Sequence, residues 1–263
     1  MYLHQFFGDT PEPRQCAECQ GDQRLGFEFR LAFQPVIDAR DRSIYGYEAL
    51  VRTPEGGSAA DVIAQVTPDL LYRFDQTCRV RAIATAAALG LQSRLFINFF
   101  PNAVYQPATC IRLTLRAAQI SGFPTENLVF EAAESEEVRD QAHVRRIFSD
   151  YRSRGFQTAI DDFGAGYAGL SSLTGFQPDL IKLDMGLIRG IDTDPVRQAI
   201  VAGTARIASG IGSTLLAEGV ETAGEYRMLR ALGIDLFQGY LFGRPALERL
   251  ETVPEALWAE LEH

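Results

Sequence analysis

The sequence predicts an α/β fold, a TIM-like (βα)8 barrel with an antiparallel first strand, and three observations support this prediction. The chain has 263 residues, near the roughly 250 typical of a single (βα)8 barrel. Apolar strand-like segments alternate with helical segments of about ten or more residues, the pattern of βαβ units in a parallel sheet. The first two strand candidates are joined like a hairpin, and with them the sequence contains eight strands, which favours a closed barrel over an open doubly wound sheet.

The elements follow one another in a regular order after an irregular start. Residues 1–28 are polar and interrupted by proline and glycine, so they predict an irregular N-terminal extension, and residues 29–263 predict the barrel domain. The strand candidates are 29–38, 44–52, 95–100, 128–133, 157–163, 180–184, 213–219 and 236–242. The helical candidates are 68–89, 107–120, 136–153, 195–209, 223–232 and the terminal segment ETVPEALWAELEH.

The composition argues against several classes of protein. Hydrophobic residues make up 46% and charged residues 22% of the chain, as expected of an ordinary globular protein with a large core. The net charge of −9 argues against a basic surface for polymeric nucleic acid, although a metal and a few arginines could still meet a small anionic ligand. Apolar runs stay well below the about 20 residues that span a bilayer, and the N-terminus lacks the features of a signal peptide. We therefore expect a cytoplasmic protein, alone or within a larger assembly, without membrane insertion.

The four cysteines are too sparse and uneven for a disulfide framework. Cys16 and Cys19 have the spacing of metal ligands in CAEC, and with His4 and a further group they could hold a structural zinc ion. The sequence has no second pair with this spacing, and a structural zinc site normally needs four ligands. Reduced thiols in a polar N-terminal arm are therefore the favoured interpretation.

Polar residues of ligating or catalytic type stand at or near the C-terminal ends of seven predicted strands. In a (βα)8 barrel these ends converge on one face, where the active site is built. Carboxylates gathered there would repel one another and be costly to desolvate unless cations neutralise them or some stay protonated. Oxygen ligands without histidine or cysteine favour Mg²⁺ or Mn²⁺ over zinc, although each carboxylate alone could equally be a helix N-cap or a surface charge. The residues are Glu48, Asn98, Glu131, Asp161, Asp162, Lys182, Glu218 and Gln238.

Two positions in this group need a local explanation. Strand alternation turns Lys182 into the barrel together with Asp184, where the lysine could hold a nucleophilic water or an oxyanion, or balance the charge of an aspartate. Asp161 and Asp162 are consecutive, so both can face one site only if the strand ends between them and the chain turns, which the following glycines would permit. Adjacent carboxylates would suit two metal ions roughly 3.5–4 Å apart, which stabilise the attacking and leaving oxygens of a phosphoryl displacement.

These residues resemble those of a known family, the EAL-domain phosphodiesterases of bacterial cyclic di-GMP signalling. The motifs occur in the family's order over about residues 29 to 246, and such a spaced set is far more specific than any single motif. They are QPV (34–36), YEALVR with Glu48-Ala49-Leu50, DDFGAGY (161–167), IKLD (181–184), AEGVET (217–222) and QGYLFGRP (238–245).

The resemblance implies an activity and a role for each residue. The implied reaction is hydrolysis of one phosphodiester bond of cyclic di-GMP to linear pGpG, by in-line attack of water, with two divalent cations, Mg²⁺ or Mn²⁺. It also implies a homodimer formed through helices near the DDFG loop. The implied metal ligands are Glu48, Asn98, Glu131, Asp161 and Asp162, and the catalytic group is Glu48, Lys182, which would orient the water, Glu218 and Gln238. Gln34, Leu50, Arg52 and Asp184 would lie against the substrate, with Arg52 at a phosphate, while Glu134 and Glu221 would brace the DDFG loop.

The chain departs from the usual family pattern near the site. Ala165, Ala168 and Gly169 stand where the family usually has Thr, Ser and Ser, Ala132-Ala133 replaces a Leu-Thr pair, and INFFP replaces INLSP. These changes remove hydroxyl groups but no expected ligand, so they bear on loop ordering and rate more than on the chemistry. A catalytically silent receptor for cyclic di-GMP or a partner protein is therefore an alternative, and the residues alone would also allow another metal-dependent barrel phosphohydrolase.

Overall fold

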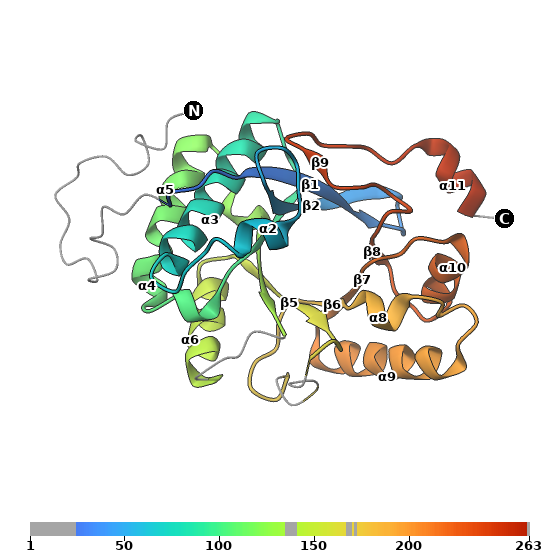
Figure 1. Cartoon of the computed structure of the whole chain (residues 1–263). Coiled ribbons are helices and arrows are strands. Elements are labelled where there is room, and N and C mark those ends of the chain that lie inside the picture. The colour runs from blue at the N-terminus through green and yellow to red at the C-terminus, as the bar shows by residue number, and fades with distance from the viewer. Residues whose placement is uncertain (1–24, 135–140, 167–169, 171–172, 262–263) are drawn as a thin grey trace.

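Nine strands form one sheet in the computed structural model, which describes residues 25–134, 141–166, 170 and 173–261 (Figure 1). Neighbouring strands follow the order β2-β3-β4-β5-β6-β7-β8-β1-β9, and β1 also pairs with β2, which closes the barrel. The predicted TIM-like barrel with an antiparallel first strand is therefore confirmed. The strands are β1 (Arg30–Asp38), β2 (Ser43–Arg52), β3 (Arg94–Asn98), β4 (Leu128–Ala133), β5 (Gln157–Phe163), β6 (Leu180–Leu183), β7 (Thr214–Ala217), β8 (Leu236–Gln238) and β9 (Ala246–Leu247).

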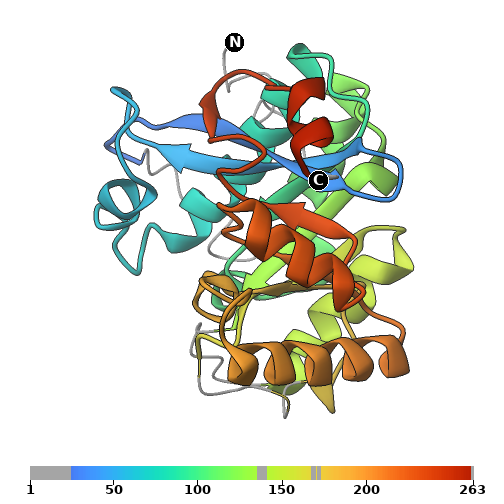
Figure 2. The ribbon, with the colours of Figure 1, turned by 90° about the vertical axis from the view of Figure 1, so that its right-hand side faces the viewer.

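Helices cover the barrel on two sides (Figures 1 and 2). The helices from α2 to α6 pack beside the first strands, and those from α8 to α11 pack beside the later ones. The helices of the described residues are α2 (Ala59–Ile63), α3 (Leu71–Ala88), α4 (Pro107–Cys110), α5 (Arg112–Ser121), α6 (Gln141–Ser153), α8 (Met185–Ile188), α9 (Pro195–Ile211), α10 (Ala223–Ala231) and α11 (Glu255–Leu261), with 3₁₀ turns η2 (Pro101–Ala103) and η3 (Thr125–Asn127). None of the helices in this part of the chain combines the length and the apolar character needed to cross a bilayer.

Some elements differ from their predicted bounds for local reasons. The helix predicted over 107–120 is split at Ile111 into α4 and α5. β3 ends at Asn98, because Pro101 lacks an amide for the strand ladder and begins η2 instead. β8 ends at Gln238, where Gly239 packs against the backbone of Val220. The short elements α2, α8 and β9 were not predicted, because five or fewer residues carry too little periodicity.

The reversed direction of β1 brings three polar residues of the first and last strands together. β1 pairs antiparallel with β2, where Gln34 lies opposite Glu48. On its other side β1 pairs antiparallel with β8, where Val36 lies opposite Gln238. Directly opposed and diagonal residues of neighbouring strands are close enough for side-chain contact. Gln34 therefore reaches the level of Glu48 and Gln238 although it lies in the middle of its strand.

Alternation along the strands builds two stacked layers inside the barrel. The inward-facing apolar side chains form a buried cluster of Val36, Phe96, Val129, Ala159, Leu180, Leu216 and Leu236. Because successive strand residues point to opposite faces, the residue two positions closer to the barrel mouth also faces inward. Those residues are Gln34 on the reversed strand, then Asn98, Glu131, Asp161, Lys182, Glu218 and Gln238. An apolar plug thus lies directly beneath a polar layer.

The predicted N-terminal extension falls mostly outside the described residues. Residues 25–28 precede β1 without regular secondary structure. His4, Cys16 and Cys19, with the zinc site considered for them, lie outside the described residues. The two described cysteines, Cys78 and Cys110, are buried and form no disulfide within the described part of the chain.

Candidate functional site

Nine polar side chains meet at the mouth of the barrel, above the apolar plug: Gln34, Glu48, Asn98, Glu131, Asp161, Asp162, Lys182, Glu218 and Gln238. Beneath Glu48, the ring of Phe96 on the adjacent strand packs against Gly46. A Cβ at Gly46, two residues before Glu48, would lie 2.7 Å from the ring of Phe96. Glycine at this position therefore lets Phe96 fill the plug under Glu48.

Lys182 is the centre of the polar layer. Its side chain is fully buried, and its Nζ lies 2.7 Å from Glu218 Oε1, 2.9 Å from Glu131 Oε1, 2.9 Å from Asp161 Oδ1 and 3.4 Å from Glu48 Oε2. It is the single lysine of the sequence, since the other 24 of the 25 basic side chains (25 − 1) are arginine. An ammonium is a compact charge with rotatable donors, whereas a guanidinium is a rigid planar fork. This position therefore uses the cation that can turn toward several carboxylates at once.

Side-chain amides orient Glu48 on both of its oxygens. Asn98 donates from Nδ2 to Glu48 Oε1 at 2.8 Å, and Gln238 donates from Nε2 to Glu48 Oε2 at 2.8 Å. Gln238 Nε2 also lies 3.2 Å from Gln34 Oε1, and Gln34 donates to the carbonyl of Gly243 at 3.0 Å. Gln238 Oε1 is buried and has no hydrogen-bond partner among the described residues. The side-chain amides of Asn98 and Gln238 thus orient the Glu48 carboxylate, and Gln238 Oε1 remains beside it as a buried acceptor.

Asp161 and Asp162 face the same site through a bulge. We expected the strand to end between them, and this was wrong: β5 continues to Phe163, with a register shift between Ile160 and Phe163. Asp162 has φ 55°, a left-handed conformation in which aspartate is tolerated better than most residues. The inserted residue removes the alternation that would have separated the two carboxylates.

Glu134 holds the loop that follows these aspartates. Its Oε2 accepts from the backbone N–H of Gly164 at 2.7 Å and of Gly166 at 3.3 Å. This contact agrees with the bracing role that the resemblance implies. Glu221, the other residue given that role, is exposed and forms an ion pair with Arg189, the residue that follows α8. Its bracing role stays a prediction.

The predicted substrate-contacting residues are placed around the mouth. Leu50 lines the cavity described below, and Arg52 is half-buried and donates from Nη1 to the carbonyl of Val51 at 2.7 Å. Burial lowers the pKa of Arg52, and the Glu48 charge opposes this change. Asp184 was expected to continue the alternation into the barrel, but β6 ends at Leu183 and Asp184 caps α8, accepting from the N–H of Gly186 at 2.8 Å. Its contact with a substrate stays a prediction.

The carboxylates form two overlapping groups that could each hold a cation. One oxygen each of Glu48, Glu131 and Asp161 lie within 4.8 Å of one another, and the same is true of Asp161, Asp162 and Glu218. With Lys182, the five carboxylates carry −5 + 1 = −4 when all are ionised. Asp161 is common to both groups. This set of hard oxygen donors fits two Mg²⁺ or Mn²⁺ ions that share a ligand.

The pKa values reflect this crowding of negative charge. Burial, reinforced by the negative charges of its neighbours, raises the pKa of Glu131 and of Glu218 well above the ordinary range. Burial and the Asp161 charge raise the pKa of Asp162 to about 6. Burial alone would lower the pKa of Lys182, but the surrounding carboxylates raise it well above its ordinary value. Protein groups alone therefore leave the cluster short of positive charge, which divalent cations would supply.

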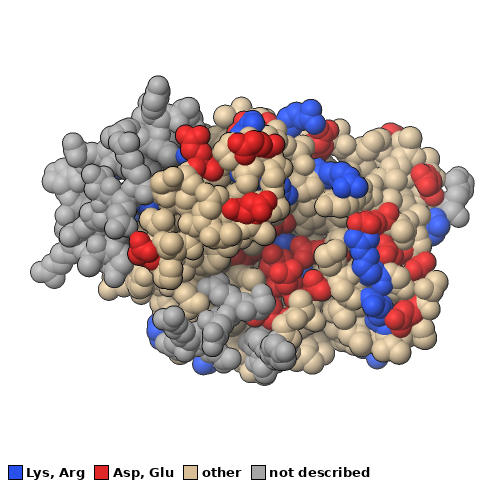
Figure 3. Space-filling model, in the orientation of Figure 1, with Lys and Arg blue, Asp and Glu red and all other residues tan. Residues whose placement is uncertain are grey.

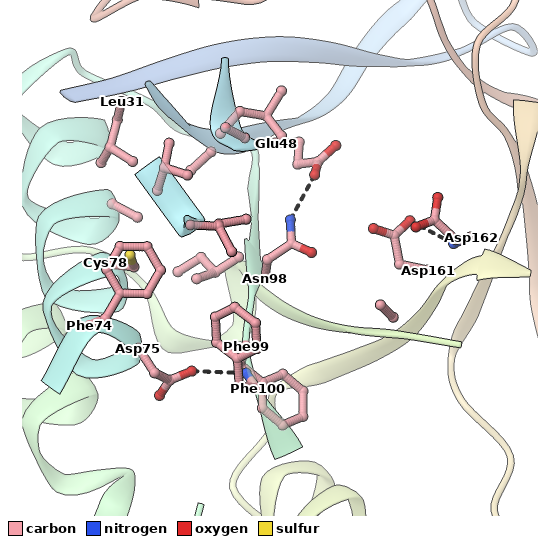
Figure 4. Close-up of a pocket in the computed structure, with 18 residues that line it drawn as sticks. Leu31, Glu48, Phe74, Asp75, Cys78, Asn98, Phe99, Phe100, Asp161 and Asp162 are labelled. Carbon is pink, nitrogen blue, oxygen red and sulfur yellow. Dashed lines mark hydrogen bonds between the residues drawn. The ribbon is translucent and has the colours of Figure 1, made fainter. Parts of the chain in front are cut away.

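A cavity of about 460 Å³ opens beside the acidic cluster (Figures 3 and 4). Figure 3 shows acidic side chains gathered in a hollow near the centre of this face. From Glu48, Asn98, Asp161 and Asp162 the cavity extends beneath α2 and along α3, where its lining is mostly apolar. The sequence reasoning missed this wall, which includes Ile63, Phe74 and Cys78. For Ile63 the signal was weak, because residues 53–70 carry no clear period, and the helix predicted over 68–89, which contains Phe74 and Cys78, was not assigned to the site.

Comparisons with known proteins agree with this geometry. The EAL domain model matches residues 20–245. Among curated relatives, the blue light- and temperature-regulated antirepressor BluF of Escherichia coli is 30% identical over 231 residues, covering 88% of this chain and 57% of BluF. The cyclic di-GMP phosphodiesterase PdeR of Escherichia coli is 30% identical over 227 residues, covering 82% of this chain and 33% of PdeR. The chain thus spans between about a third and just over half the length of these two relatives.

Two solved structures are similar over most of the chain. The c-di-GMP bound form of a standalone EAL protein from Vibrio cholerae has a TM-score of 0.85 and 50% identity, and covers 90% of this chain and 98% of its own. A manganese and c-di-GMP complex of Klebsiella pneumoniae BlrP1 has a TM-score of 0.81 and 37% identity, and covers 86% of this chain and 58% of its own. With the family model matching most of its length, this chain belongs to the EAL domain family.

Proposed function

We propose that this protein is a metal-dependent phosphodiesterase that hydrolyses cyclic di-GMP to linear pGpG. The observation that carries the proposal is the group of five carboxylates and Asn98 around one buried lysine at the barrel mouth. The similarity to EAL proteins whose structures contain c-di-GMP supports the choice of substrate. Manganese in one of those structures supports a divalent cation as cofactor.

The residues that would hold two cations are Glu48, Asn98, Glu131, Asp161 and Asp162. Mg²⁺ or Mn²⁺ held there would make water more acidic and would stabilise charge developing on the phosphodiester oxygens. Asn98 fits this role because its Nδ2 is engaged by Glu48, which leaves its amide oxygen available as a ligand.

The remaining polar residues would handle the water and its proton. Lys182 has an ammonium that donates hydrogen bonds and would orient the attacking water. Glu218 lies 2.7 Å from Lys182 and has a raised pKa, so it is suited to accept and return a proton. Gln238 offers a buried acceptor, Oε1, for a hydrogen of the water or the substrate.

The substrate would lie across the mouth. Gln34, Leu50, Arg52 and Asp184 would contact it, with Arg52 as the cation for a phosphate. The apolar cavity wall near Leu50 would accept a flat base. Arg52 suits a phosphate because a guanidinium can donate two parallel hydrogen bonds.

The direct test is chromatography of cyclic di-GMP incubated with purified protein and Mn²⁺. We expect pGpG from the wild type and none from Glu48→Ala, which loses a ligand and the partner of Asn98, Lys182 and Gln238. Glu248→Ala is the matched control, because this exposed carboxylate pairs with Arg30 on the sheet edge. Cleavage of generic phosphodiesters but not of cyclic di-GMP would instead indicate a different barrel phosphohydrolase.

A catalytically silent receptor is the second candidate, and two observations favour it. Ala165 stands at a loop position where the family usually has threonine, and one similar protein is named an antirepressor. Calorimetry separates the two functions: binding of cyclic di-GMP in the presence of Mg²⁺, with no pGpG formed at high protein concentration, would support the receptor.

We also propose that the protein forms a homodimer through the outer face of α9. Val196, Ile200 and Ile207 are 65%, 47% and 37% exposed, and their spacing places them on one side of this helix. Light scattering should give a dimer for the wild type and a monomer for Ile200→Asp. The control Ser209→Asp, an exposed polar position on another side of the same helix, should stay dimeric.

We also propose a division of the chain into two parts, based on its sequence pattern. Residues 29–263 would form the EAL barrel and residues 1–28 an irregular extension, in a cytoplasmic protein. Limited proteolysis tests this division, with early cleavage expected before residue 29 and a stable barrel fragment after it.

A further inference from the structure

A buried charged cluster lies behind the candidate site, between α3, α6 and the outer faces of β3 and β4. It consists of Asp75, Arg79 and Tyr151, of which Asp75 is 1% exposed and the other two are fully buried. Aspartate and arginine are almost never fully buried unless they are paired. Replacing such a pair by apolar residues is often neutral or stabilising, so stability alone is a weak reason for its presence.

The cluster packs against the residues adjacent to two candidate ligands. Arg79 Nη2 lies 2.8 Å from Asp75 Oδ2, and Arg79 Nη1 donates to Tyr151 Oη at 2.6 Å. The guanidinium carbon of Arg79 lies 5.2 Å from the ring centroid of Phe99 and 5.3 Å from that of Phe130. Phe99 follows Asn98 and Phe130 precedes Glu131, and alternation turns these rings outward while the ligands face inward.

Asp75 also holds the backbone that follows Asn98. Its Oδ1 accepts from the N–H of Phe100 at 3.0 Å, just beyond the end of β3. The preceding N–H, that of Phe99, donates to the carbonyl of Glu131 at 2.9 Å in the last contact with β4. The backbone that follows Asn98 is thus held by β4 on one side and by α3 on the other, and Figure 4 shows the contact with Asp75 of α3.

We propose that Asp75 is a positioning residue for Asn98, and that Arg79 and Tyr151 hold Asp75 in place. The inference rests on the proposed function, in which Asn98 is a metal ligand. Asn98 is exposed at the rim of the mouth, and its side chain is oriented by a 2.8 Å hydrogen bond to Glu48. The position of the Asn98 side chain depends on the position of its backbone. Asp75 fixes that backbone by accepting a hydrogen bond from the N–H of Phe100.

Two double variants isolate the proposed contact. Asp75→Asn with Arg79→Met removes both charges and keeps a side-chain oxygen for the N–H of Phe100. Asp75→Leu with Arg79→Met removes the same charges and that oxygen, with a side chain of similar shape. Both variants avoid an unpaired buried charge, which is the main hazard of changing one partner alone.

The first measurement is Mn²⁺ affinity, from the electron paramagnetic resonance signal of free Mn²⁺. We expect the leucine variant to bind Mn²⁺ about tenfold more weakly than the asparagine variant, the lower end of losses seen when a residue supporting a ligand is changed. Hydrogen exchange at the N–H of Phe100 should be faster in the leucine variant, with or without metal. Leu229→Ala, at a buried position of α10 across the barrel from α3, controls for general loss of stability and should keep wild-type Mn²⁺ affinity.

Tyr151→Phe keeps the test decisive if a double variant does not fold. This substitution removes one hydroxyl, and the variant should bind Mn²⁺ more weakly than the wild type. The control is Ser213→Ala, which loses the hydrogen bond to the Pro178 carbonyl at the other end of the barrel and should keep wild-type Mn²⁺ affinity. Equal Mn²⁺ affinity and equal Phe100 exchange in the two double variants, or an unchanged affinity in Tyr151→Phe, would overturn the inference. Failure of the wild type itself to bind Mn²⁺ would refute the proposed function instead, and Phe100 exchange would still decide whether Asp75 anchors this segment.

Discussion

Lys182→Met is the substitution that most directly probes how the acidic cluster is held together. Methionine keeps much of the length and the apolar stem of the side chain and removes its ammonium. Four carboxylate oxygens lie between 2.7 and 3.4 Å from that ammonium in the fully buried site. The variant therefore leaves five carboxylates at the mouth without their central positive charge.

The expected loss of stability follows from these contacts. At about 3 Å and an effective dielectric constant of about 20, one ion pair contributes about 5.5 kcal/mol of attraction. Most of the sum over four partners is offset by repulsion among the carboxylates, by desolvation, and by protonation once the ammonium is gone. Removing one partner of a buried ion pair typically costs about 3–5 kcal/mol, and we expect a loss in this range for metal-free protein above neutral pH.

The loss should shrink as the pH falls. Glu131 and Glu218 have raised pKa values in the folded protein, although the charge of Lys182 lowers them. Without Lys182 these pKa values should rise further, so the folded variant binds protons more readily than the unfolded chain does. Its free energy of unfolding must then rise as the pH drops toward the ordinary carboxyl value of about 4.3. Lys182 itself, with a raised pKa, contributes stability below about pH 10.4 that is lost only above that value.

Urea unfolding in the presence of a chelator, followed by the fluorescence of the buried Trp258, measures both effects. Arg249→Met is the control, because this arginine side chain is 73% exposed and pairs with Glu251 on the surface. An unchanged free energy of unfolding in Lys182→Met above neutral pH would refute the account of the cluster. A loss that grows toward acidic pH would refute it equally.

Three further predictions follow from single features of the site. Mn²⁺ affinity should rise with pH through about 6, because the raised pKa of Asp162 keeps that carboxyl protonated below this value, and the raised pKa of Glu131 should let the rise continue above it; calorimetry at several pH values would contradict this if affinity stayed constant. Glu134→Gln should weaken Mn²⁺ binding by about tenfold, since the loop amides lose a charged acceptor, while Glu251→Gln should not; equal affinities would remove Glu134 from the support of the site. Gly239→Ala should destabilise the fold by about 1–3 kcal/mol or more, because the new Cβ would lie 2.0 Å from the Val220 carbonyl oxygen, whereas Gly203→Ala in open space on α9 should stabilise it by about 0.5–1 kcal/mol; equal thermal shifts in the two variants would contradict this.

The position of the site could be predicted from sequence because two periodic rules act together. Strand alternation fixes which residues face inward, and barrel closure brings the strand ends to one face. Residues such as Glu131 and Lys182, each two positions beyond a buried apolar residue, therefore meet although they are distant in sequence. In the structure, the reversed strand β1 lies between β2 and β8, and Gln238 lies beside Glu48.

Other features of the site could not be predicted from strand alternation, because they depend on local backbone conformation and on tertiary packing. The left-handed conformation of Asp162 and the bulge around it replace the strand end that we expected. Asp75 and Arg79 read as polar positions of a helix rich in alanine and arginine, and their burial becomes visible only when the segments around Tyr151 pack against them. Contacts of this kind join segments that are distant in sequence, and the local pattern of one segment does not indicate which other segment packs against it.

The metal requirement of the proposed reaction can be tested by measuring turnover of cyclic di-GMP while Mn²⁺ is titrated into chelator-treated protein. Bound Mn²⁺ and released pGpG should be followed on the same sample. We expect no product without metal, and product formation that rises with occupancy of the acidic cluster. Turnover that is unaffected by the chelator, or no pGpG when the cluster is saturated with Mn²⁺, would contradict it.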